Sequence, residues 1–442
     1  MAEAENPRNL KSGKLGVVQV AALGVSLVIV GQFTGWNFGL QVGGLGGMMV
    51  AACIVLGMYV GLSGCVLELA TAMSSAGGTH TYGRVAFGPL AGYLSGVSVL
   101  LALTLGVGIV AEFIAAYARS VFGFGGWALK IVLVAAVVGI HIRGVREASS
   151  FTVLTSVVAV LVLVAFVALM LPHFSVLHLY DSATGRTLFP GSIAGVFACI
   201  PFAMWLFLAI ENTALAVEEV DDPVVTLPRG LMAALLTVAL IGFAVLVFGT
   251  GGAGVSAIKT ADDPLYAALV STSAGSNVWS ARLIGVGAIS GLLASFFSLM
   301  YAASRQLFAI AREGDLPAAF AAVGSRGTPW VALLVVAFIA TVVSAVPPSR
   351  LVVPIVLLLD VSYVLLMAAY LRIQTTHTLP QRRYRAWGGK YVAWITLGLT
   401  IVILISCMQL DATTIVSIGG FYVIAAAVFL LSSSSRANPD SV

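Results

Sequence analysis

Glu211 has the most distinctive chemical setting in this sequence, because it is a carboxylate in an otherwise apolar segment. The segment begins at Phe197 and reads FACIPFAMWLFLAIENTALAVEEVDDP, with Pro201 in its first half. An ionisable group in hydrocarbon is costly, so it faces a protein interior or a wet cavity and has a function. We interpret the segment as a broken membrane helix that lines a binding site. Desolvation would let Glu211 carry a proton near neutral pH, whereas the alternative is a structural acid paired with backbone or a neighbouring helix.

Further acidic residues extend this hypothesis. The end of the segment is an acidic cluster that we expect to lie in water, made of Glu218, Glu219, Asp221 and Asp222. Glu112 and Asp360 lie inside predicted spans, where a small amine without a carboxylate would gain most from an anionic partner. The alternatives are an outer-mouth position for Glu112 and a structural role for Asp360, and Glu68 is interpreted as structural. No lysine or arginine is predicted near the site, so an acidic substrate would meet no fixed positive charge.

A second break is predicted in the first apolar segment, whose middle reads VGQFTGWNFG. Glycines and polar side chains at mid-membrane depth are tolerated where the backbone lines a cavity. The predicted break consists of Gly31, Gln32, Phe33, Thr34 and Gly35. The alternative is a glycine-rich helix-packing face. Aromatic side chains that could cover a cation near the two breaks are Phe33, Trp36, Trp205, Phe207, Phe296 and Phe297.

Coupling to an ion stays open at this stage. The five histidines show no metal spacing, so no metal or cofactor is expected. Because no nucleophile motif or phosphate loop is present either, an enzyme and a nucleic-acid partner are not expected.

The whole chain predicts a membrane protein. It has 442 residues, of which 60% are hydrophobic and 9% charged, and its mean hydropathy is +1.06. A spanning helix needs about 20 apolar residues, and roughly twelve such stretches are present. The four cysteines lie within these stretches and are expected to be free thiols. We therefore predict an all-α integral membrane protein with twelve transmembrane helices.

The predicted order of segments suggests two halves. Each interrupted helix starts a run of five spans, and the two runs have opposite topology, which is typical of transporters. The segments are an N-terminal tail at 1–14, a first repeat at 15–172, a second repeat at 190–372, a linker at 373–390, two further helices at 391–432 and a tail at 433–442. Most of the 22 lysines and arginines fall on the side of both termini, which are therefore predicted to be cytoplasmic. The stretch from Ser74 to Pro89 is predicted to be a polar loop.

Three motifs resemble the amino acid–polyamine–organocation (APC) permeases. They are AGGTHTYGRVAFGPLAGYLSG from Ala76, WLFLAIENTALAVEEVDDPVVTLPRG from Trp205 and YAASRQLFAIAREGDLP from Tyr301. Within that superfamily, the segments around the two breaks look most like the ethanolamine permease branch, which often has an acid where this chain has Gln32. The resemblance implies the APC/LeuT-like fold, a 5+5 inverted repeat with helices 1 and 6 broken and two extra C-terminal helices.

The resemblance also implies roles and a function. Trp205 would cover the substrate from outside, Leu206 to Ile210 would be unwound, and Glu211 would couple protons or hold the site together. Sodium-coupled relatives of this fold place hydroxyl ligands on helix 8, where this chain has Ser295 and Ser298. The lysine that replaces sodium in some proton-coupled relatives is absent from the predicted fifth span, so the coupling ion stays open. The expected substrate contacts then comprise Gly31, Gln32, Phe33, Thr34, Gly35, Glu112, Trp205, Leu206, Phe207, Ile210, Glu211, Phe296 and Asp360. We predict a secondary transporter in the plasma or inner membrane that imports a small amine such as ethanolamine by alternating access, coupled to protons. The alternatives are a neutral amino acid permease or exchanger, with sodium as a possible coupling ion, and a nutrient sensor.

Overall fold

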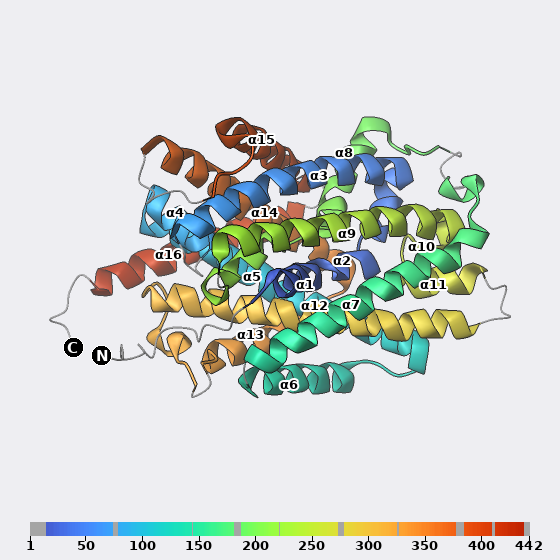
Figure 1. Ribbon diagram of the computed structural model, residues 1–442, viewed down its shortest axis with the longest axis horizontal. Coiled ribbons are helices and arrows are strands. Elements are labelled where there is room, and N and C mark those ends of the chain that lie inside the picture. Colours follow the sequence, from blue (N-terminus) through green and yellow to red (C-terminus); the bar gives the residue numbers. More distant parts are fainter. Residues whose placement is uncertain are drawn as a thin grey trace.

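The protein is a bundle of long helices, as expected for an all-α membrane protein (Figure 1). The computed structural model describes residues 15–73, 78–143, 145–180, 187–220, 222–272, 278–324, 327–376, 384–408 and 412–436. Within these ranges, nine helices are long and apolar enough to cross a membrane, and shorter apolar helices accompany them. The four cysteines are free thiols, as predicted.

The α-helices follow one another along the whole chain. They are α1 (Val17–Val28), α2 (Val30–Phe33), α3 (Asn37–Met73), α4 (Thr79–Phe87), α5 (Pro89–Phe122), α6 (Trp127–Arg143), α7 (Val145–Met170), α8 (Ser192–Trp205), α9 (Pro223–Ala253), α10 (Val255–Ile258), α11 (Pro264–Thr272), α12 (Val278–Arg312), α13 (Trp330–Val343), α14 (Pro348–Thr376), α15 (Gly389–Met408) and α16 (Ala412–Arg436). Short 3-10 helices are η1 (Leu171–His173), η2 (Val176–Leu179), η4 (Ile210–Glu219) and η5 (Ala318–Ala321).

The first span is broken at the end of the predicted stretch, because Gly31, Gln32 and Phe33 are helical and only Thr34 and Gly35 lie in the turn. Helix α2 ends at Phe33, the next three residues form a turn, and α3 begins at Asn37. Gly35 adopts a φ of +91°, a left-handed conformation that favours glycine. A second glycine, Gly44 with a φ of +65°, kinks α3, so its first residues complete the first span and the remainder forms the second.

The sixth span is broken as well, but the chain does not return to an α-helix after the break. Helix α8 ends at Trp205, turns occupy residues 206–209, and η4 continues as a 3-10 helix to Glu219. The predicted unwound stretch, Leu206 to Ile210, agrees with this. Ala209 adopts a φ of +71°, and such a left-handed conformation costs a residue with a Cβ about 1–2 kcal/mol.

The two broken spans lie inside the bundle and the C-terminal helices lie at its edge. Helix α1 packs against α7, α9 and α12, while α8 packs along α3. Helix α5 packs against α12 and α14 (Figure 1). Helix α15 packs on α14 and α3, and α16 packs on α5, as expected for helices added to a ten-helix core.

One connection differs from the sequence prediction, and a second contains short helices. Residues 74–89 were expected to form a loop, but Thr79 to Phe87 form α4, which packs on α5; residues 74–77 lie outside the described ranges. The connection after α9 contains α10 and α11. In Figure 1, α4 lies toward one end of the long axis and α10 and α11 toward the other. We call these the α4 end and the α11 end.

Candidate functional site

Two hydrogen bonds join the breaks of the first and sixth spans. The Gln32 side chain donates from Nε2 to the carbonyl oxygen of Leu206 at 2.8 Å. In the opposite direction, the Trp205 indole donates from Nε1 to the carbonyl oxygen of Thr34 at 3.0 Å. Each break therefore supplies a side-chain donor to a carbonyl that the other break has freed from α-helical bonding. Because unsatisfied buried carbonyls are costly, these bonds fix the two breaks side by side.

Two glycines permit this close approach. A Cβ added to Gly31 would lie 2.4 Å from the carbonyl oxygen of Trp205. A Cβ added to Gly35 would lie 2.4 Å from the indole nitrogen of the same tryptophan. Real carbon atoms do not approach so closely, so packing requires glycine at both positions, and Gly35 is also favoured by its left-handed φ.

A small cavity lies beside the two breaks. Its volume is about 20 Å³, enough for about one water molecule. The lining residues come from both broken spans and from α5, α12 and α14, and they are Leu27, Val30, Ala102, Leu103, Gly106, Trp205, Leu208, Ala209, Leu299, Ile355 and Leu359. Among the described residues, no charged side chain lines the cavity, and Trp205 is the only aromatic one. The site is therefore apolar and closed in this conformation.

Other predicted site residues are buried but do not line the cavity. Phe33, Phe207 and Phe296 are fully buried, and Ile210 is buried beside them in sequence. The carbonyl oxygen of Phe33 accepts a 2.9 Å hydrogen bond from the Tyr117 hydroxyl. The Thr34 hydroxyl donates to the carbonyl oxygen of Asp262 at 3.0 Å, which ties the first break to the connection between α10 and α11. The substrate contacts expected of these predicted site residues remain predictions.

Glu211 and Asp360 lie close to the cavity but do not line it. Glu211 is 3% exposed and Asp360 is fully buried. One oxygen of Glu211 accepts a 2.6 Å hydrogen bond from the amide of Asn212, and the other faces the Tyr363 hydroxyl without a well-formed bond. Glu211 lies two residues after the cavity residue Ala209 in sequence. Asp360 directly follows the cavity residue Leu359.

Glu112 has a different environment from the one predicted. Its carboxylate pairs with Lys130 of α6 at 2.5 Å and with Arg119 at 2.9 Å. Lys130 is 5% exposed and also donates to the carbonyl oxygen of Ser344 at 2.6 Å. Lys130 and Arg119 therefore already compensate the charge of Glu112. Glu112 was predicted to be the anionic partner of a substrate amine. Because its charge is already paired, this prediction loses its basis.

Ser295 and Ser298 bind the first span rather than standing free around an ion site. Ser295 donates from its hydroxyl to the carbonyl oxygen of Ser26 at 2.7 Å and accepts from the backbone N–H of Val30 at 3.1 Å. The hydroxyls of Ser298 and Ser26 lie 2.6 Å apart. These bonds hold α1 and α2 against α12. Among the described residues, no group of three or more His, Cys, Asp or Glu side chains could hold a metal ion.

Glu219 closes the bundle toward the α4 end. It was expected in water with the rest of the acidic cluster, but it is 4% exposed. Its carboxylate accepts hydrogen bonds from Tyr301 at 2.6 Å and from Arg305 at 3.1 Å, both on α12. The buried cation explains the difference, because a paired carboxylate no longer needs water. Asp222 is exposed as predicted, while Asp221 and the side chain of Glu218 lie outside the described residues.

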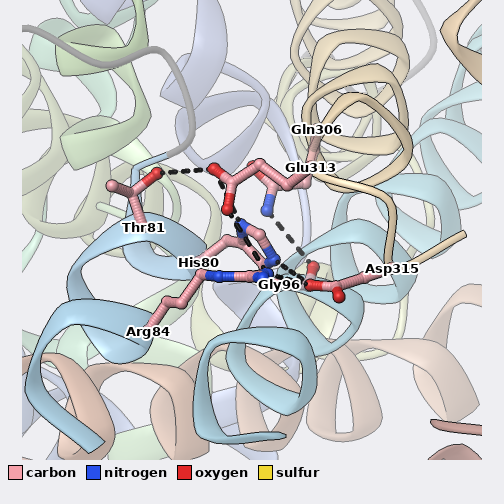
Figure 2. Close-up of polar contacts among 7 residues, drawn as sticks. All are labelled: His80, Thr81, Arg84, Gly96, Gln306, Glu313 and Asp315. Carbon is pink, nitrogen blue, oxygen red and sulfur yellow. Dashed lines mark hydrogen bonds and ion pairs between the residues drawn. The ribbon is translucent and has the colours of Figure 1, made fainter. Parts of the chain in front are cut away.

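A second ion-pair cluster joins α4 to the segment that follows α12 (Figure 2). His80 Nε2 lies 3.0 Å from Asp315, and Arg84 donates to the same carboxylate oxygen at 2.6 Å. His80 Nδ1 lies 3.5 Å from Glu313. Burial by itself would lower the pKa of His80, but the hydrogen bonds and charges of Asp315 and Glu313 raise it above its ordinary value of 6.5. The cluster therefore favours a protonated His80 where α4 contacts the segment that follows α12.

Several residues of the site had no signal in the sequence. The apolar cavity residues, such as Leu103 and Ile355, are ordinary residues of apolar spans, so composition does not separate them from lipid-facing positions. The buried tyrosines Tyr59 and Tyr363, which face Glu211, could have been found as hydroxyls within predicted spans. His80 lies inside a quoted motif, but its partners Glu313 and Asp315 are more than 200 residues away in sequence.

Two broken helices that meet at a closed apolar cavity inside a multi-span bundle define a membrane transporter. The amino acid permease family model matches residues 15–432, so the chain belongs to the amino acid permease family, whose members are membrane permeases and not enzymes. An uncharacterized transporter of Rhizobium meliloti (strain 1021) is 30% identical over 319 residues, which cover 70% of this chain and 67% of that protein. The branched-chain amino acid permease of Bacillus subtilis (strain 168) is 24% identical, with 75% and 74% covered. The gamma-aminobutyric acid permease of Escherichia coli (strain K12) is 23% identical, with 76% of each chain covered.

Proposed function

We propose that this protein is a secondary transporter of neutral amino acids with apolar side chains. The observation that carries the proposal is the cavity between the broken spans, whose lining is apolar. An apolar wall stabilises an aliphatic side chain and gives a charged one no partner, since burying an unpaired charge costs several kcal/mol. The branched-chain substrate in the name of one relative agrees with this chemistry.

The backbone of the breaks would hold the charged ends of the substrate. Half-helix N-termini favour anionic groups, and half-helix C-termini favour cations. The N-terminus of α3 at Asn37 would attract the substrate carboxylate, and the C-terminus of α8 at Trp205 would attract the amino group. Trp205 would cover the substrate, and the Gln32 and Trp205 bonds would re-form each time the site closes.

Ethanolamine, the small amine predicted from sequence, is the second candidate. The observation in its favour is the carboxylate of Glu211, two residues beyond cavity residue Ala209. A shift of η4 that brought Glu211 to the cavity would provide an anionic partner for an amine. Glu112 no longer supports this candidate, because Lys130 and Arg119 already compensate it.

We propose protons as the coupling ion and a cytoplasmic position for the α4 end. Ser295 and Ser298 are occupied by contacts with α1 and α2, which speaks against a preformed sodium site. Arg84, Arg305 and Arg312 lie at or near the α4 end, as the positive-inside rule requires of a cytoplasmic face. We therefore expect the protein in the cell membrane with both termini on the cytoplasmic side.

The test is uptake by purified protein in proteoliposomes. Labelled leucine, alanine, glutamate and ethanolamine are supplied outside, with an inward proton gradient and without sodium. The proposal predicts concentrative uptake of leucine or alanine, with glutamate excluded. Concentrative uptake of ethanolamine that leucine does not inhibit would favour the second candidate, and a strict requirement for sodium would overturn proton coupling.

A further inference from the structure

Asp360 is unlike the other buried or half-buried carboxylates of the described chain. The others have donors or cations within reach: Glu68 accepts from Tyr370, Gln374 and the backbone N–H of Ala386, Glu112 pairs with Lys130 and Arg119, Glu219 with Arg305, and Asp315 with His80 and Arg84. Asp360 is fully buried on α14, and neither of its oxygens has a hydrogen-bond partner among the described residues. An ionised carboxylate is not stable in such surroundings, so Asp360 is a protonated acid in this conformation.

The groups around Asp360 contain acids and hydroxyls rather than cations. Tyr59 of α3 is within electrostatic reach of both Asp360 and Glu211, and Cys407 of α15 is within reach of Asp360. The hydroxyls of Tyr59 and Tyr363 lie 3.4 Å apart, and Tyr363 faces Glu211. Both tyrosines are fully buried. Two carboxyl groups and two hydroxyls thus form a polar cluster inside an apolar core, with no lysine, arginine or histidine interacting with it among the described residues.

This cluster lies directly behind the wall of the cavity. Leu359 lines the cavity and precedes Asp360, and Ala209 lines it two residues before Glu211. Ala209 is also the residue in the strained left-handed conformation. A substrate that displaces Leu359 or Ala209 when it widens the cavity would move one of the two acids relative to the other. Because like charges close together cannot both be ionised, such a displacement changes how firmly the pair holds its protons.

We propose that Asp360 is a second proton-binding residue of the transport cycle and acts together with Glu211, with Tyr59 within electrostatic reach of both acids. The inference rests on the proposed function, since it names the residue that binds the coupling proton of that transporter. Substrate binding and proton binding are linked through the shared wall, Leu359 and Ala209. Asp360 does not contact the substrate in this arrangement, so its removal should spare binding and damage coupling.

The first experiment separates binding from coupling. Wild type, Asp360→Asn and the control Glu68→Gln are placed in proteoliposomes with a pH-sensitive dye inside, and leucine-driven proton flux is measured beside equilibrium leucine binding. Asp360→Asn is expected to bind leucine within about threefold of wild type while its proton flux per leucine falls about tenfold or more. Glu68→Gln, which alters a carboxylate far from the cluster, is expected to keep the wild-type ratio. Wild-type proton flux per leucine in Asp360→Asn would overturn the proposal.

The second experiment uses wild-type protein and does not depend on the substrate. A hydrophobic carbodiimide reacts with protonated carboxyl groups in apolar surroundings, and peptide mass spectrometry locates the adduct. We expect labelling at Asp360 near pH 6 that declines as the pH rises, and no labelling at Glu68. Absence of an adduct at Asp360 throughout this range, with Glu211 labelled, would overturn the proposal even if Asp360→Asn does not fold. If no amino acid binds wild type but Asp360 is labelled, the proposed substrate fails while the proton site stands.

Discussion

The side chain of Gln32 and the backbone of Leu206 are joined by a 2.8 Å hydrogen bond that links the first broken span to the sixth. The two residues are far apart in sequence, and each lies where its helix loses regular hydrogen bonding. Their bond can persist only while the two breaks lie side by side. It is therefore a direct indicator of the closed state.

Replacing Gln32 by Ala should lower uptake about tenfold, because a buried carbonyl left without a donor costs about 1–3 kcal/mol. Gln32→Glu is a sharper variant, since only a protonated glutamate can donate to Leu206. Its uptake should fall as the pH rises above neutral, relative to wild type. Proteoliposome uptake as a function of pH measures both effects, and a Gln32→Glu profile that parallels wild type would contradict this role.

Gly31→Ala should destabilise the protein by about 1–3 kcal/mol and abolish uptake, because the added methyl group overlaps the Trp205 carbonyl oxygen. The matched control is Gly57→Ala on α3, where a Cβ meets nothing within 4 Å. Thermal unfolding in detergent should separate the two variants by several degrees. Equal melting temperatures would show that the breaks do not pack as closely as the structure indicates.

Ala209→Gly should stabilise the protein by up to about 1 kcal/mol. The left-handed conformation of Ala209 costs about 1–2 kcal/mol, more than the 0.5–1 kcal/mol of chain entropy that glycine loses on folding. Ala203→Gly, in regular helix on α8, should have the opposite sign. The melting temperature should rise in Ala209→Gly and fall in Ala203→Gly. A loss of stability in Ala209→Gly would argue against strain at this turn.

The His80 cluster should make stability depend on pH. The pKa of His80 is raised in the folded protein, so its contribution is complete below the unfolded value of 6.5 and is lost as the pH rises through the folded pKa. Glu313 has a lowered pKa, because pairing with His80 and Arg84 outweighs burial, and its contribution is lost only in acid, below 4.5. The melting temperature should therefore fall as the pH rises above 6.5 in wild type. His80→Gln should flatten that slope, and an unchanged slope would exclude His80 as its origin.

Glu112→Gln should lower stability without changing substrate affinity. It leaves Lys130, which is 5% exposed, without its carboxylate, and breaking a buried pair costs about 3 kcal/mol. Leucine affinity should stay within about twofold, since Glu112 does not line the cavity. The double variant Glu112→Leu with Lys130→Met should recover much of the lost stability. A large loss of leucine affinity in folded Glu112→Gln protein would indicate that Glu112 does contribute to substrate binding.

The sequence by itself determined the membrane class, the two breaks and the family resemblance. These are local properties, because hydropathy is summed along one segment and helix breaks arise from glycine and polar residues within a few positions. Breaks near Gly31 to Gly35 and Leu206 to Ile210 could therefore be predicted without a structure, and the turns lie at residues 34–36 and 206–209.

The tertiary structure alone decided what each buried charge does. Glu112 and Glu219 became paired because Lys130 and Arg305 reach them from other helices, whereas Asp360 received no partner among the described residues. The apolar lining of the cavity likewise comes from five spans that are distant in sequence. The free energy of a charge in a membrane protein depends on the groups within a few ångströms of it. Those groups are brought together by the packing of distant helices, so no local pattern in the sequence could reveal them.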